Sequence, residues 1–197
     1  MQAIEDVELP CKFAENGCKY VGTRSELWDH MIWNDCSFDK KIECQNWSCT
    51  EMVSMEKMVD HLKAAHKSSV LGTNGKAVGK LTKIHATGRW SPSIFELGSN
   101  IFLIQARTER DDWLIWVVLM GTEEDAKKYE VTMTIQDDQG LPLVEFPGKV
   151  FSNYEKNKVG IVEEGVLQLD KAMAENVASK NADGNLSLKV FYDIIRK

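Results

Sequence analysis

Hydrophobic and polar residues alternate with a period of two along much of the chain beyond residue 80. From Tyr129 to Ile135, Tyr, Val, Met and Ile occupy every second position, and Glu and Thr lie between them. This alternation is typical of a strand with one buried face. Four further segments rich in β-branched or aromatic residues predict strands over 101–106, 113–120, 141–146 and 186–192.

Turn-forming residues separate these segments. The stretches 137–140 and 183–184 combine Asp with Gly and predict turns, because glycine accepts a positive φ without steric cost. Two short helices are also predicted: 122–128 begins with a threonine that can cap it, and 170–178 begins with an aspartate. Several short strands at this spacing predict an all-β, antiparallel sandwich with one or two short helices.

The first 66 residues have a different pattern. All five cysteines and three of the four histidines lie there. The following stretch, 67–80, holds two serines and three glycines without a long apolar run, so it is interpreted as a junction or loop. We therefore expect a linker at 1–10, small zinc-binding α+β fingers at 11–36 and 44–66, a junction at 67–79 and the sandwich at 80–197.

Cysteine usage points to metal. An odd number of cysteines fits a closed disulfide framework poorly. The first eight residues are acidic where a secretory signal would be positively charged, and no run approaches eighteen apolar residues. We therefore expect a protein of the cytoplasm and nucleus without a membrane partner. In a reducing compartment, interleaved Cys and His indicate metal ligands.

The cysteines and histidines form two sets of four with matched spacing. In each set, eleven residues separate the second ligand from the third, and a predicted helix, over 25–31 or 54–65, presents the later ligands. Four Cys and His ligands suit one tetrahedral Zn²⁺ and leave no open position for substrate, so two structural zinc ions are predicted. The first set is Cys11, Cys18, His30 and Cys36; the second is Cys44, Cys49, His61 and His66.

Two alternatives remain open at this point. Asp35 is a chemically possible fourth ligand of the first site in place of Cys36. The cysteines can also be read as buried apolar fillers and the histidines as satisfied surface residues. Two successive sets that use every cysteine favour zinc.

Charge argues against nucleic acid as a partner. Residues 1–66 carry seven Lys and Arg against twelve Asp and Glu, a net of −5 out of −6 for the whole chain. Binding to a phosphate backbone needs a basic surplus that releases counterions. The finger region would repel such a backbone.

The paired fingers, together with segments 66–69, 119–126 and 182–190, resemble the seven-in-absentia family of ubiquitin ligases. The resemblance implies two zinc fingers and a TRAF-like sandwich that dimerises and binds substrates or adaptors. In that family an upstream RING domain recruits the ubiquitin-conjugating enzyme. The family's first finger usually has three residues between its histidine and last cysteine, whereas this chain has five.

No set of eight RING ligands accompanies the two fingers in this sequence. We therefore do not expect the chain alone to transfer ubiquitin, and a conjugating enzyme is expected as a partner only where a RING is present. The expected function is the substrate-binding or adaptor-binding portion of a ligase that directs proteins to proteasomal degradation. The alternative is a RING-less interaction or decoy protein that binds partners or full-length relatives without ubiquitinating them.

The resemblance also implies a peptide groove. In the family, a Pro-x-Ala-x-Val-x-Pro segment adds as a strand, and the tryptophan of an Asp-Trp-Val segment lines the site. Here Arg89-Trp90-Ser91 occupies that position, with arginine in place of the aspartate. A lone tryptophan in a β domain is more often a core residue. The candidate groove residues are Trp90, Arg89, Ser91, Leu81, Thr82 and Ile84.

Overall fold

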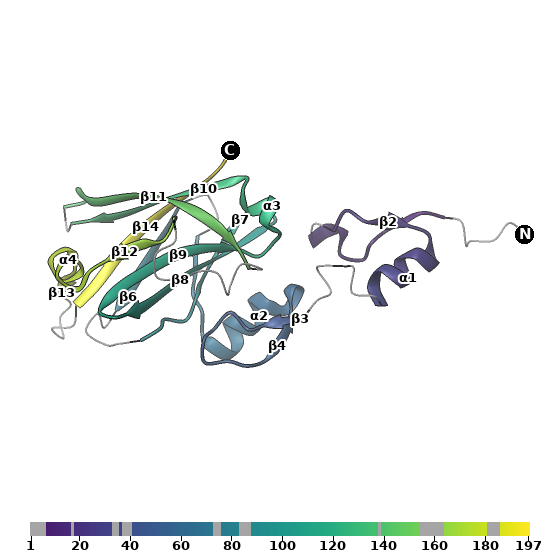
Figure 1. Ribbon diagram of the computed structural model, residues 1–197, viewed down its shortest axis with the longest axis horizontal. Helices are drawn as coiled ribbons and strands as arrows, with labels where there is room; N and C mark the ends of the chain where they lie inside the picture. Colours follow the sequence, from purple (N-terminus) through teal and green to yellow (C-terminus); the bar gives the residue numbers. More distant parts are fainter. Residues whose placement is uncertain are drawn as a thin grey trace, which may run out of the picture. The chain divides into compact units, whose positions relative to one another are not determined.

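The computed structural model describes residues 7–16, 18–32, 36, 41–72, 76–82, 88–137, 139–153, 164–180 and 186–197. The chain divides into two compact units, Met1–His66 and Lys67–Lys197 (Figure 1). Among the described residues, no helix combines the length and apolarity that a membrane span requires.

The first unit repeats one small motif, a short antiparallel hairpin followed by a helix. In the first copy β1 (Leu9–Pro10) pairs with β2 (Val21–Gly22), the 3-10 helix η2 (Ala14–Asn16) lies between them in sequence, and α1 (Arg24–Ile32) follows. In the second copy β3 (Lys41–Glu43) pairs with β4 (Met52–Ser54), and α2 (Met55–His66) follows. Both predicted finger helices are confirmed.

The second unit is a sandwich of two connected sheet layers (Figure 1). Its elements are β5 (Val70–Gly72), β6 (Lys76–Thr82), β7 (Ser93–Leu97), β8 (Asn100–Glu109), β9 (Asp112–Leu119), α3 (Glu123–Ala126), β10 (Tyr129–Gln136), β11 (Pro142–Ser152), β12 (Leu167–Leu169), α4 (Lys171–Val177), β13 (Ser179–Lys180) and β14 (Leu186–Arg196). The predicted fold class, zinc fingers followed by a β-sandwich, is confirmed.

One strand connects the two layers. The first part of β11, up to Lys149, pairs with β10, which in turn pairs with β14 and through it with β6. The last three residues of β11 pair with β9, and from there the second layer runs through β8 and β7 to β5. Side chains that face inward from both layers share one core.

Two strand pairs depart from the antiparallel expectation. β11 runs parallel to β9, and β5 runs parallel to β7. Alternation along one strand reports its buried face but carries no information about the direction of its neighbour.

The predicted strands and caps of the sandwich are present. All five predicted strand segments fall on strands, namely β8, β9, β10, β11 and β14. Thr122 caps α3 by accepting from the N–H of Asp125, and Asp170 caps α4 by accepting from the N–H of Met173. Oδ1 of Asp137 accepts from two backbone N–H groups, of Gln139 and Leu141, in the turn before β11. The turn predicted at 183–184 lies outside the described residues.

The interpretation of 67–80 as a junction or loop is wrong in part, because β5 and most of β6 lie within it. Along β6 the buried positions are Ala77, Gly79 and Leu81. The small residues there have a packing reason, since a Cβ at Gly79 would lie 3.0 Å from the ring of Tyr192 on β14. A strand whose inward side chains are mostly small lacks the hydrophobic alternation that identifies strands in sequence.

Candidate metal centres and peptide groove

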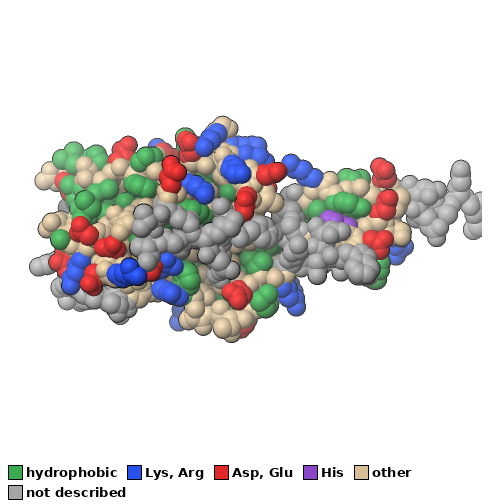
Figure 2. All heavy atoms as spheres, in the orientation of Figure 1, with side chains coloured by type: hydrophobic (Ala, Val, Ile, Leu, Met, Phe, Trp, Pro, Cys, Tyr) green, Lys and Arg blue, Asp and Glu red, His purple; other side chains and the backbone are tan. Residues whose placement is uncertain are grey.

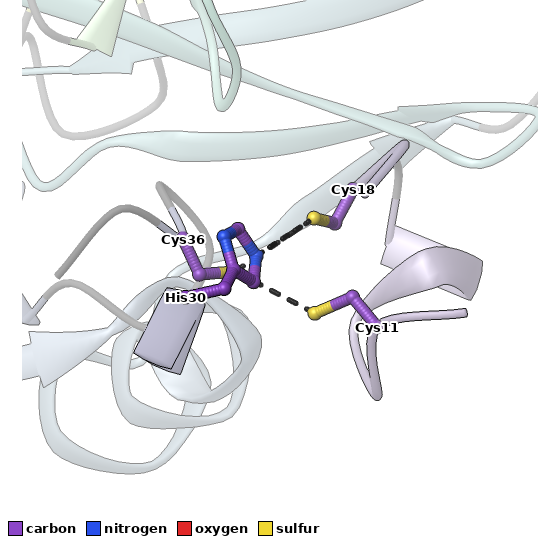
Figure 3. Close-up of side chains that lie close together, drawn as sticks. All are labelled: Cys11, Cys18, His30 and Cys36. Atoms are coloured by element: carbon purple, nitrogen blue, oxygen red, sulfur yellow. Dashed lines mark hydrogen bonds between the residues drawn. The ribbon is translucent and has the colours of Figure 1, made fainter. Parts of the chain in front are cut away.

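The first metal cluster gathers four side chains from separate parts of its finger. Cys11 follows β1, Cys18 precedes β2, His30 lies in the last turn of α1, and Cys36 lies beyond that helix. Their ligand atoms all lie within 4.8 Å of one another. Figure 3 shows the three sulfurs and the imidazole pointing toward one another.

The distances between these atoms match the edges of a zinc tetrahedron. Zn–S bonds of about 2.3 Å and Zn–N bonds of about 2.0 Å place two sulfurs about 3.8 Å apart and a sulfur and a nitrogen about 3.5 Å apart. Sγ of Cys36 lies 3.8 Å from Sγ of Cys11 and 3.8 Å from Sγ of Cys18. Sγ of Cys18 lies 3.5 Å from Nε2 of His30.

The second cluster has the same geometry with one more histidine. Nε2 of His66 lies 3.4 Å from Sγ of Cys44, and Nε2 of His61 lies 3.5 Å from Sγ of Cys49. The two imidazole Nε2 atoms are 3.2 Å apart, close to the edge of about 3.3 Å that two Zn–N bonds give. Both rings therefore present the same nitrogen to one point.

The sulfur spacing excludes disulfides. A disulfide places its sulfurs about 2.05 Å apart, and none of the five cysteines is in a disulfide. Their spacing fits thiolates that share an ion.

Neighbouring groups orient the metal ligands. Two backbone N–H groups also lie near thiolate sulfurs and partly offset their negative charge. The backbone N–H of Phe13 lies 3.5 Å from Sγ of Cys11, and that of Asn46 lies 3.4 Å from Sγ of Cys44. Tyr20 stacks on the ring of His30 with centroids 4.1 Å apart. A carboxylate oxygen of Glu51 lies 3.5 Å from Nδ1 of His61, so that nitrogen can donate while Nε2 binds metal.

A capping box fixes the start of the helix that carries His30. Thr23 donates to the Glu26 carboxylate through its N–H at 2.8 Å and through its hydroxyl at 2.9 Å, and its Oγ1 accepts from the N–H of Glu26 at 3.4 Å. The backbone hydrogen bond from Thr23, followed by the side-chain bond, holds the pKa of Glu26 below its usual value. The helix begins at a fixed residue, and His30 therefore keeps its place relative to the cysteines.

Each cluster supplies four protein ligands, which closes a tetrahedral site. The chain therefore carries two structural zinc ions, which hold together fingers whose small buried clusters are insufficient to stabilise them alone. Cys36 belongs to the first cluster and is fully buried. The alternative ligand, Asp35, lies outside the described residues.

The candidate groove centres on Trp90. Its backbone N–H donates to the carbonyl of Ala106 on β8 at 3.2 Å, and its indole Nε1–H donates to the carbonyl of Thr82 on β6 at 3.1 Å. Its ring lies 4.6 Å from that of Trp113 and packs against the core. Trp90 therefore connects the two layers at the end of β6.

The other candidate groove residues lie in different environments. Arg89 and Ser91 flank Trp90 and are exposed, and Thr82 is exposed at the end of β6, whereas the Leu81 side chain faces the core and is only 9% exposed. Ile84 lies outside the described residues. The sequence prediction did not include Val78 and Lys80, whose side chains lie on the exposed face of β6. The sequence offered only a faint signal for them, because the inward positions with which they alternate include the small residues Ala77 and Gly79.

Residues 2–79, which contain both clusters, match the family described as "Sina, zinc finger". Relatives match the sandwich as well. The chain is 24% identical over 191 residues to the E3 ubiquitin-protein ligase siah2 of Xenopus laevis, which covers 93% of this chain. The chain is thus similar to seven-in-absentia proteins in its zinc fingers and over most of its length.

The corresponding human protein, E3 ubiquitin-protein ligase SIAH2, gives the same identity over the same length. The chain spans 59% of the length of the Xenopus relative and 57% of that of the human relative. The matched region includes both the zinc fingers and the sandwich that carries Trp90.

Proposed function

We propose that this seven-in-absentia-like chain is the part of an E3 ubiquitin ligase that binds substrates or adaptors and presents them for ubiquitin-dependent degradation. It holds an extended peptide that adds as a strand to the open edge of β6. The observation that carries the proposal is the pairing of β6, which among the described strands is hydrogen-bonded only to β14.

Two contacts indicate which backbone groups of β6 face the open edge. The carbonyl of Thr82 accepts from the indole of Trp90, and the carbonyl of Lys76 lies beside Gly72 of β5, 2.8 Å from where a Cβ would stand. The N–H and C=O of one strand residue point to the same side, and the direction alternates with a period of two. The backbone groups of Val78 and Lys80 therefore face the same edge as those of Lys76 and Thr82. The edge is open at Val78 and Lys80 and is covered at its two ends, by Gly72 beside Lys76 and by Trp90 beside Thr82.

Strand addition suits such an edge. Main-chain hydrogen bonds supply affinity, and pockets for alternate side chains supply specificity. The free stretch at Val78 and Lys80 accommodates a peptide of about four to five residues, at about 3.3 Å per residue. Trp90 closes one end and offers an indole beside the last peptide position.

The layer that contains β6, β14 and β10 has a second edge, the first part of β11, which is less suited to binding an added strand. The first part of β11 pairs with β10, and on this stretch it carries Pro142 and Pro147. Proline lacks the N–H that a docking strand would need, and prolines on an edge strand protect it from pairing. Between the two edges, the chemistry favours β6.

A fluorescence-polarisation titration with a labelled Pro-x-Ala-x-Val-x-Pro peptide tests the proposal on the zinc-loaded chain. Val78→Pro removes one outward N–H without removing a bond to β14, and Val78→Thr is the matched control that keeps it. We expect Val78→Pro to weaken binding by about tenfold, the equivalent of one or two hydrogen bonds. Trp90→Phe, which keeps an aromatic ring but loses the indole donor, should weaken it as well.

Saturable binding that both substitutions weaken, with Val78→Thr unchanged, supports the proposal. Equal affinity of wild type and Val78→Pro contradicts it. If the chain binds peptide yet gives no ubiquitin transfer when joined to a RING, it acts as an interaction or decoy protein.

A further inference from the structure

We infer that the open edge of β6 selects an acidic extended segment. The inference rests on the proposed function, since it names the chemistry of the peptide that the same edge would bind. It is carried by the charges that surround Val78 and Lys80, which oppose the net charge of the whole chain.

Two lysines stand directly opposite each other beside the edge. Lys80 on β6 pairs in register with Lys189 on β14, and both side chains are exposed on the same outer face. Residues directly opposite on antiparallel strands have Cβ atoms about 5 Å apart, and like charges at that distance destabilise a sheet. A carboxylate placed beside them by a bound strand would relieve this repulsion.

The groups that the structure places next to Lys80 and Lys189 leave these two positive charges in excess. Lys76, four residues further along β6, has its own partner, because its Nζ lies 3.6 Å from a carboxylate oxygen of Asp193, the residue opposite it on β14. Nζ of Lys189 lies 5.3 Å from the ring centroid of Phe191, an aromatic rather than an anionic neighbour. Arg89, at the Trp90 end of the edge, adds a further exposed positive charge.

This local excess contrasts with the rest of the molecule. The whole chain carries a net charge of −6. An acidic segment is therefore repelled by most of the surface and attracted to this edge. Complementary charge of this kind speeds association and fixes where a partner docks.

A peptide fits this edge better than a nucleic acid. The outward N–H and C=O groups of Val78 and Lys80 match the two-residue repeat of an extended peptide, which places every second side chain on the outer face beside Lys80 and Lys189. Glu or Asp at such a position lies beside the ammonium of Lys80, with that of Lys189 one strand further away, about 10 Å from the bound strand. A polyanionic backbone would meet the chain's acidic surplus as well.

Three peptides test the inference by fluorescence polarisation on the full zinc-loaded chain. They share the Pro-x-Ala-x-Val-x-Pro frame and carry Glu, Gln or Lys at the variable positions. We expect the Glu peptide to bind about tenfold more tightly than the Gln peptide at low salt and the Lys peptide to bind most weakly, with the spread shrinking as salt screens the charges.

Protein variants in which a lysine is replaced by glutamate provide a second test of the inference. Lys80→Glu should remove or invert the preference for the Glu peptide, and it folds readily because it places opposite charges across the strand pair. Lys127→Glu, which changes an exposed lysine beyond the other end of β10, should leave the preference unchanged.

The outcomes separate the two claims. Equal affinity for all three peptides, with Val78→Pro still weakening each, overturns the charge inference and leaves the proposed function standing. Absence of binding by all three contradicts the proposed function and the inference with it. Displacement of the Glu peptide by a single-stranded oligonucleotide at equal concentration overturns the inference, because the edge then recognises polyanions in general.

Discussion

Tyr192 has an unusual position for a tyrosine in a sandwich core. Its side chain is almost fully buried beside Gly79, and its hydroxyl has no hydrogen-bond partner in the described part of the chain. Burial raises the pKa of Tyr192 well above its ordinary value. The phenol therefore stays protonated in the folded chain, and its oxygen forfeits the hydrogen bonds that water provides to the unfolded chain.

Replacing Tyr192 by Phe should leave the free energy of unfolding unchanged or raise it by about 1 kcal/mol, because an unsatisfied buried polar group is removed at nearly constant shape. Urea denaturation measures this, with Tyr192→Ala as a control that should cost about 3 to 5 kcal/mol through the cavity it leaves. A loss of more than about 2 kcal/mol in Tyr192→Phe would show that the hydroxyl does have a stabilising partner.

The same residue predicts a pH dependence. A folded pKa above the unfolded value of about 10 means that, at higher pH, the unfolded state binds fewer protons than the folded state. The stability due to Tyr192 is therefore fully present below about pH 10 and is lost as the pH rises beyond it. Wild type should lose stability at alkaline pH more steeply than Tyr192→Phe, and parallel curves would refute the burial argument.

The two clusters follow from the sequence, whereas the surroundings of Trp90 do not. Matched spacing of Cys and His picked out the eight residues that the structure gathers into two groups, because a tetrahedral ion requires four donors within reach. The role of Trp90 depends on two hydrogen bonds, to Ala106 and Thr82, that join residues distant in sequence. Such contacts follow from topology, which alternation within single strands does not reveal.

At the scale of elements, β11 shows how the sandwich protects one of its edges. Leu141, just before this strand, and Leu143, within it, are 59% and 48% exposed, and hydrophobic side chains gather over this part of the visible face (Figure 2). An exposed apolar edge strand is a site of aggregation unless something blocks pairing. Pro142 and Pro147 supply that block.

We predict that the double substitution Pro142→Thr and Pro147→Thr promotes self-association. Threonine restores two N–H groups on an edge strand and suits a β conformation, so the fold should persist while the edge becomes able to pair. Light scattering over a concentration series measures the change, and circular dichroism checks the fold. Leu143→Thr, which keeps both prolines, is the control and should not promote association.

If the double variant stays monodisperse at every concentration at which wild type does, the prolines do not protect this edge. Both edges would then be equally resistant to pairing, and the prolines would no longer be a reason to prefer β6 over β11 as the edge that binds a peptide.

The elements that the sequence predicted are those with large inward side chains. β10 buries Tyr129, Val131, Met133 and Ile135, and its alternation is clear in the sequence. β6 buries Ala77 and Gly79, sized to fit Tyr192, and its alternation is faint. The passage of β11 from one layer to the other is a long-range property that no local pattern encodes.

At the scale of the whole molecule, the two compact units depend on different forces. The sandwich buries a large apolar core from both of its layers. The fingers bury few side chains, and in the first finger the buried core consists of Phe13 and two of the zinc ligands, Cys11 and Cys36. Zinc binding of this kind supplies on the order of 10 kcal/mol of folding free energy.

Removing zinc should therefore unfold residues 1–66 and leave the sandwich folded. Titration with a chelator, followed by NMR, should collapse the finger resonances while those of the sandwich core, such as Phe102 and Ile115, persist. Added Zn²⁺ should restore the spectrum, and Mg²⁺, which prefers oxygen ligands, should not. Finger resonances indifferent to the chelator would show that the clusters do not hold structural metal.

Amide hydrogen exchange along β6 tests most directly the claim that partners add to this edge as a strand. In the free chain, the N–H groups of Val78 and Lys80 should exchange quickly, whereas those of Ala77 and Gly79, which face β14, should be protected. Saturating peptide should slow exchange at Val78 and Lys80 and leave Ala77 and Gly79 as they were. Protection that develops elsewhere in the sandwich while Val78 and Lys80 keep exchanging quickly would contradict the account.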